Sequence, residues 1–111
     1  MTSTAFTFVI RSYKNREYID ETLFASTRDA IADIVSGQID ADSIVSVIEI
    51  DLIAGTSKNV TGHVALEVWR SLDADNSFAW REMRDWLETF GHDCEHLDGE
   101  SKDLARDFYG R

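Results

Sequence analysis

Proline is absent from the 111 residues, and no stretch is repetitive or rich in serine and glycine. The chain therefore offers neither a linker nor a repeat array, and its length suits one domain with one core. No apolar run approaches the roughly 18 residues of a membrane span, and the opening MTSTAFTFVIRSYK does not resemble a secretory signal. We expect a single domain over residues 1–111, in a cytoplasmic protein without a membrane partner.

Basic residues are scarce: 11 Lys and Arg stand against 21 Asp and Glu, a net charge of −10. Affinity for a phosphate backbone comes from Lys and Arg, so this balance argues against direct nucleic-acid binding. It also allows an acidic decoy, a protein that occupies the basic nucleic-acid-binding surface of another protein.

Cysteine is represented only by Cys94, which excludes a disulfide within the chain. Cys94 lies in GHDCEH between His92 and His96, a spacing without the second ligand pair of common zinc sites. We predict no metal site and no cofactor, and interpret residues 91–101 as an irregular polar loop. The neighbouring acids should raise the pKa of the thiol, which disfavours a nucleophilic role.

Alternating side chains predict the strands. Phe6, Phe8 and Ile10 share one face of a first strand and Thr7 and Arg11 the other, so one face should lie in the core. Residues 18–25 form a weaker second strand. Residues 43–53, SIVSVIEIDLI, form the best strand, with one face nearly all apolar and the other acidic halfway along.

The helices follow from capping residues and apolar stripes. Ser26 or Thr27 should cap a first helix that ends at Gly37. A second helix should span about 62–72. A third should span 78–90, capped by Asn76 or Ser77.

Residues 102–109 add a short fourth helix. The order β-β-α-β-α-α defines an α+β fold, with a small three-stranded antiparallel sheet (order 2-1-3) packed with three to four helices.

The segment GTSKNVT, residues 55–61, joins the best strand to the second helix and admits two interpretations. Helix N-termini attract anions, so Lys58, Ser57, Asn59 and Thr61 could bind a ligand. The P-loop pattern fails, however, because Val60 stands where its second glycine belongs. The same residues also suit a turn followed by a helix cap.

The segment DLIAGTSKNVTGHVALEVW resembles a motif of small bacterial proteins of unknown function, in which a strand runs into a GxS(K/R)(D/N)V(S/T) helix start. The similarity covers roughly residues 6–72. It departs at Asn59, where Asp is the expected residue of the motif, and at Gly62 and His63, where acids are expected. It implies the order of elements and no activity.

No catalytic motif such as G-x-S-x-G or H-E-x-x-H occurs, and we assign no catalytic residue. Glu49 and Asp51 share one strand face, either as a carboxylate pair or as its solvent side. The aromatic edges of the second and third helices indicate a contact surface instead. Its residues would be Leu66, Trp69, Trp80, Arg84 and Leu87.

The first hypothesis for function is a non-enzymatic protein-interaction or regulatory module with a protein partner or a homodimeric state. The alternatives are a small ligand-binding protein or enzyme with an anion site at Gly55–Thr61, and the acidic decoy.

Overall fold

Four strands and three α-helices make up the part of the chain that the computed structural model describes, residues 5–14, 16–19, 23–75 and 79–97. Their order is β1 (Ala5–Tyr13), β2 (Arg16–Ile19), α1 (Thr27–Val35), the short 3-10 helix η1 (Ala41–Ser43), β3 (Ile44–Asp51), β4 (Thr56–Asn59), α2 (Thr61–Asp75) and α3 (Arg81–Glu88).

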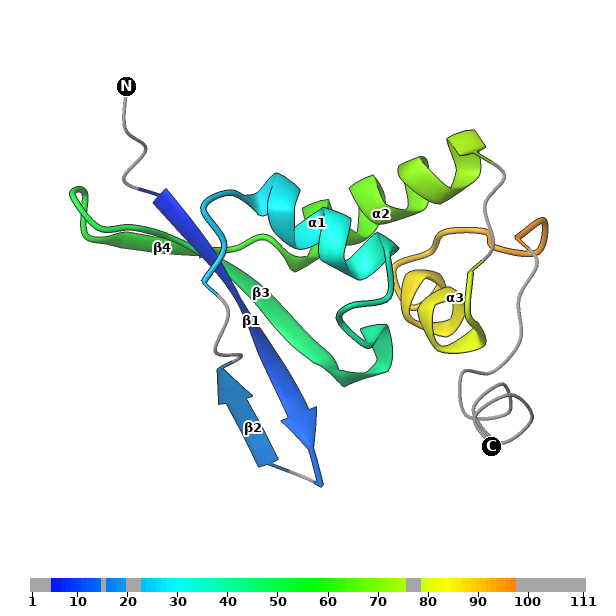
Figure 1. The fold of residues 1–111 in the computed structure, drawn as a ribbon, viewed down its shortest axis with the longest axis horizontal. Coiled ribbons are helices and arrows are strands. Elements are labelled where there is room, and N and C mark those ends of the chain that lie inside the picture. Colours follow the sequence, from blue (N-terminus) through cyan, green and yellow to red (C-terminus); the bar gives the residue numbers. More distant parts are fainter. Residues whose placement is uncertain (1–4, 15, 20–22, 76–78, 98–111) are drawn as a thin grey trace.

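The strands form one antiparallel sheet in the order β2-β1-β3-β4 (Figure 1). The predicted α+β class and the antiparallel sheet are confirmed. The predicted number of strands is wrong, because β4 adds a fourth strand beside β3.

Helix α1 begins and ends where local sequence signals place it. Ser26 is the N-cap, and its hydroxyl accepts a hydrogen bond from the backbone N–H of Asp29. Gly37 has a φ of 83°, the left-handed conformation that ends a helix at little cost for glycine. The apolar side of α1 turns inward, and its residues Ala30 and Ile34 are fully buried.

Helices α2 and α3 differ from their predicted bounds. Helix α2 is longer than predicted, whereas α3 begins only at Arg81 because Trp80 is still extended. The predicted caps Asn76 and Ser77 and the predicted helix 102–109 lie outside the described residues.

One face of the sheet carries the helices. Val9 and Val47 lie opposite each other in the β1–β3 register, and both are fully buried. Helix α1 contacts β1 and helix α2 contacts β3. The hydroxyls of Thr7 in β1 and Thr27 in α1 are 3.0 Å apart, which places α1 on the Thr7 side. The core therefore lies on the face of Thr7, Val9 and Val47.

The other face, called the open face below, carries the larger apolar side chains. Residues directly opposite in an antiparallel pair point to the same side, so the register alone defines this set. Its members are Phe6, Phe8 and Ile10 of β1, Ile19 of β2, and Ile48 and Ile50 of β3.

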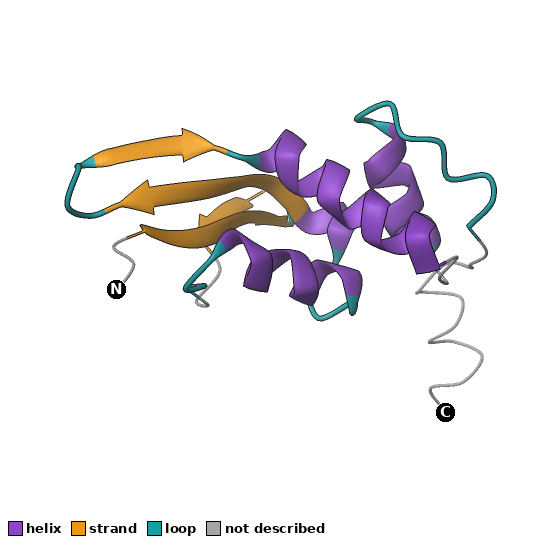
Figure 2. Cartoon of the chain, turned by 90° about the horizontal axis from the view of Figure 1, so that it is seen from above, coloured by secondary structure: helices purple, strands orange, loops and turns teal. Residues whose placement is uncertain are grey.

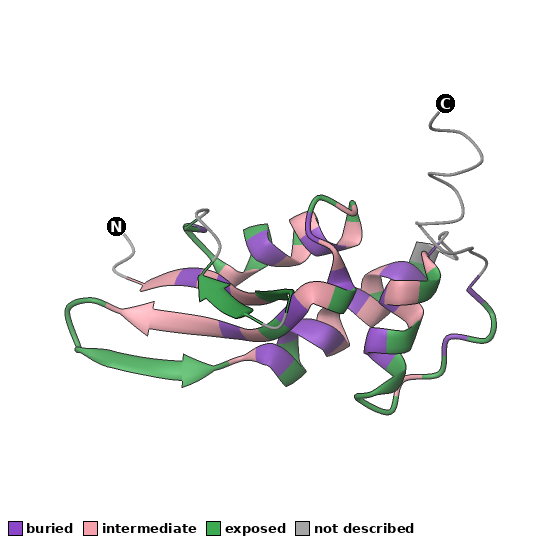
Figure 3. Ribbon diagram, turned by 90° about the horizontal axis from the view of Figure 1, so that it is seen from below, coloured by how far each residue is buried: buried purple, intermediate pink, exposed green. Residues whose placement is uncertain are grey.

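In the view from below, no described helix lies in front of strands β3 and β4 (Figure 3). Figure 2, from above, shows the helices gathered toward one end and the β3–β4 hairpin extending beyond them.

The assignment of the two faces predicts an inverted order of mutational cost. Val47→Ala opens a cavity in the core and should lower the free energy of unfolding by about 2–3 kcal/mol. Ile48→Ala removes a larger side chain, but from the open face, and should cost about 1 kcal/mol. Denaturant melts in dilute solution measure both. A larger loss for Ile48→Ala would contradict the assignment.

Candidate functional site

The segment predicted to bind an anion is a β-hairpin rather than a loop before a helix. The backbone N–H groups of Ile53 and Ala54 donate to Oδ1 of Asp51 at 3.0 and 3.1 Å. Gly55, with a φ of 67°, donates its N–H to the Asp51 carbonyl. Gly55 therefore turns the chain into β4, six residues before α2 begins at Thr61.

Thr61 joins the end of β4 to the sheet. Its buried hydroxyl accepts a hydrogen bond from the N–H of Val47 at 2.8 Å, while Val60 N–H donates to the Val47 carbonyl. Asn59 Oδ1 accepts from the N–H of Thr61, one of the donors that a helix start leaves unsatisfied. Both side chains therefore have structural partners at the point where the β3–β4 pairing ends. Loss of one of these buried hydrogen bonds would lower the free energy of unfolding by about 1–3 kcal/mol.

Lys58 projects toward the helix side of the sheet and pairs with Glu49. Their charged atoms are 3.5 Å apart, and the Lys58 side chain is 70% exposed. The other Glu49 oxygen accepts from the Thr27 hydroxyl at 3.0 Å. Since that hydroxyl gives its single hydrogen to Glu49, the hydrogen between Thr27 and Thr7 comes from Thr7. Thr7, Thr27, Glu49 and Lys58 form a polar chain, called the threonine–glutamate seam below.

Lys58, the cation of the predicted anion site, is already paired with Glu49. The Glu49 carboxylate lies beside the first residue of α1, so the helix already has a negative group at its positive end. An incoming phosphate would meet Glu49 and would have to displace it from Lys58. The Glu49 carboxylate therefore opposes anion binding at Lys58.

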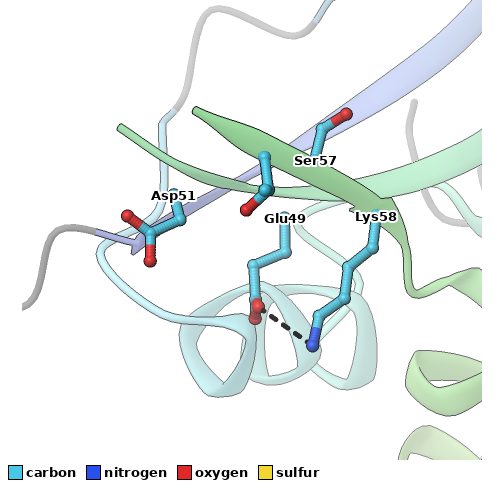
Figure 4. Close-up of a pocket in the computed structure, with 5 residues that line it drawn as sticks. Glu49, Asp51, Ser57 and Lys58 are labelled. Atoms are coloured by element: carbon cyan, nitrogen blue, oxygen red, sulfur yellow. Dashed lines mark ion pairs between the residues drawn. The ribbon is translucent and has the colours of Figure 1, made fainter. Parts of the chain in front are cut away.

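The predicted ligand-binding residues come together only in part, because Lys58 and Asn59 line one hollow that Ser57 and Thr61 do not line. Ser57 points to the opposite side of the hairpin from Lys58 and Glu49, and Asp51 stands apart from both (Figure 4). A neighbouring hollow, open to solvent, lies between the starts of α1 and α2. Its lining consists of Thr27, Glu49, Lys58, Asn59, Val60, Gly62 and His63.

Residues 91–97 of the predicted irregular polar loop contain no helix or strand, but they pack against α2 instead of lying in solvent. The ring of His92 stacks on Trp69 at 5.4 Å, and the Trp69 indole N–H donates to the Asp93 carbonyl at 2.8 Å. His96 Nε2 lies 2.6 Å from Asp73. Cys94 and Leu97 are buried, at 1% exposure each. Residues 98–101 of the predicted loop lie outside the described part of the chain.

Burial, followed by the carboxylates of Glu88 and Asp93, raises the pKa of the Cys94 thiol to about 11, against a lowering by Arg84. The predicted direction is confirmed, but burial rather than charge is the main cause. A thiol that stays protonated at neutral pH is a poor nucleophile and a poor metal ligand. The described residues contain no cluster of metal-binding side chains, and His92, Cys94 and His96 each have a different neighbour.

The chain itself covers much of the contact surface predicted on the second and third helices. Leu87 is fully buried, so its assignment to that surface is wrong. Trp69 lies under the loop, and Arg84 donates to the Leu97 carbonyl at 3.4 Å. Leu66 and Trp80 are half-buried, and Trp80 lies beside Gly37 at the end of α1.

The open face is the surface that the residue patterns did not single out. Phe6, Phe8, Ile48 and Ile50 are partly exposed there, and Ile19 is 61% exposed. The sequence did contain a signal for a second covered face. The middle residues of β1 and β3 are apolar on both faces, as in strands that are covered on two sides. The described helices supply a single covering layer.

Comparison with protein-family models, curated proteins and solved structures finds no match for this chain. The resemblance of residues 6–72 to small bacterial proteins therefore stays a prediction. Among the helices that the structure describes, none has the length and apolar character needed to cross a membrane.

A phosphate titration tests the anion site. Phosphate stabilises proteins generally, by exclusion from their surface, so a shift in the melting temperature alone is uninformative. The seam predicts equal shifts for the wild type and Lys58→Ala at matched ionic strength. A specific site at 100 times its dissociation constant would instead add about 2.7 kcal/mol, which Lys58→Ala would abolish. That difference between the two proteins would contradict the structural role of the seam.

Proposed function

We propose that this chain is a non-enzymatic protein-interaction module whose contact surface is the open face of its sheet. The observation that supports the proposal most strongly is the position of Phe6, Phe8, Ile48 and Ile50, contiguous in the β1–β3 register on the face that the described helices leave uncovered. Apolar patches edged by polar residues mark partner sites on soluble proteins.

The polar groups near the hairpin support the same proposal by their own bonding. Glu49 is held by Thr27 and Lys58, and Asp51 is held by the turn that it closes. These bonds give both carboxylates a role in holding the hairpin to α1 and in closing its turn.

The energetics of the two faces also favour an interaction surface. Polar atoms next to an interface core need partners or water, whereas an apolar face loses only water. Beside the apolar residues, the open face carries Ser46 opposite Ile10 and Ser57 opposite Ile50. These small neutral side chains lie next to the apolar residues and tolerate either water or a partner.

Hydroxyl-radical footprinting tests the proposal. Phe6 and Phe8 should be oxidised readily in dilute purified protein and at about half the rate or less in concentrated extract of the source cells, where a partner covers them. Tyr13, which is 63% exposed at the end of β1 and faces away from the open face, is the internal control and should not change. Equal oxidation of Phe8 in both samples, with Tyr13 constant, would overturn the proposal.

A further inference from the structure

We propose that the partner on the open face is a second copy of this chain, docked face to face about a twofold axis. The inference rests on the proposed function and specifies the occupant of that surface. Four observations support it: the charge of the face, its shape, its area and the character of the sheet edges.

Charge is the first observation. A twofold interface brings each patch against the same patch of the partner, so a charged patch would meet its own sign. The chain carries a net charge of −10, which makes most of its surface unsuitable for this. The central open-face positions, from Phe6 to Ile10 on β1 and from Ser46 to Ile50 on β3, point no charged side chain to that side.

The charged residues of the strands lie away from the centre of the open face. Glu49 pairs in register with Thr7 and with Lys58, so all three point to the helix side. Glu17, which pairs with Ser12, shares the open side but sits at its outer end. A basic or acidic partner would therefore gain little from the centre of this face, whereas an identical neutral face fits it.

Shape is the second observation. Two sheets pack about 10 Å apart with their strands roughly 30° from parallel, and their side chains interdigitate. Phe8 lies opposite Ile48 and Phe6 lies opposite Ile50, so large rings alternate with branched aliphatic side chains across the two central strands. The rings form a row on β1 and the branched side chains a row beside it on β3, and a twofold axis can set the row of rings of one copy against the row of isoleucines of the other.

Area is the third observation. Strands of nine and eight residues flanked by two strands of four residues cover about 400 Å² in projection per copy, at roughly 3.4 Å per residue and about 4.8 Å between strands. This falls at the low end of specific interfaces, the range of weak and transient complexes. The expected dimer is therefore reversible and dissociates on dilution.

The sheet edges favour face packing over edge pairing. Both edge strands, β2 and β4, have four residues, and all of them are exposed. Strand β4 carries Lys58, and short charged edges are a common protection against pairing with another sheet. The longer strands β1 and β3 lie inside the sheet.

Sedimentation velocity of the full chain tests the proposal over about 5 to 500 µM, a range suited to a weak dimer. The wild type should shift from monomer to dimer across this range. Ile48→Asp should stay monomeric, because it buries two like charges at a twofold interface. Ile53→Asp, the same change at an 80% exposed position of the hairpin turn, should dimerise like the wild type.

A second variant controls for the possibility that Ile48→Asp does not fold. Ile48→Ala keeps the face neutral and should raise the dissociation constant about tenfold, with a melt that shows a folded monomer. If folded Ile48→Asp and Ile48→Ala dimerise as the wild type does, the dimer uses another surface and the inference falls.

Failure of the inference is distinguishable from failure of the proposed function. A wild type that stays monomeric throughout overturns the second copy as partner. If Phe8 is nevertheless protected in extract, the interaction module stands with a different protein. If Phe8 is protected even in dilute monomer, the chain covers its own open face, and both proposals fall.

Discussion

The packing of Val9 and Val47 against helices α1 and α2 is the constraint on which the other features depend. These two fully buried side chains lie opposite each other at the centre of the sheet. Because strand side chains alternate, burying this pair turns Thr7 and Glu49 toward the helices as well, and turns Phe8 and Ile48 away. The core, the polar seam and the open face all follow from this one choice of side.

The seam shows how polar residues on the helix side are accommodated. Thr7 is buried at 1% exposure and would be costly without a partner. The chain of contacts through Thr27 and Glu49 to exposed Lys58 connects it to solvent. Residues that looked like a binding site in the sequence therefore hold the hairpin and α1 together.

Local signals in the sequence predicted what depends on local interactions, as the cap at Ser26 and the stop at Gly37 show for α1. Strand β4 was missed because TSKN has no alternation, as expected where all four residues are exposed. The core side of the sheet was beyond the pattern too, because the face of Phe6, Phe8, Ile48 and Ile50 is the more apolar in sequence, whereas the helices bury the face of Val9 and Val47. Leu87 was misplaced because the approach of η1 and the loop 91–97 to α3 depends on tertiary packing.

The most direct test of a self-docking open face is an isotope-filtered nuclear Overhauser experiment on a mixture of labelled and unlabelled full-length chains. At high concentration, the account predicts intermolecular contacts between the ring protons of Phe8 and the methyl groups of Ile48 or Ile50, lost on dilution. Intermolecular contacts confined to Leu66 and Trp80, with none from Phe8, would contradict it and return the contact surface to the helices.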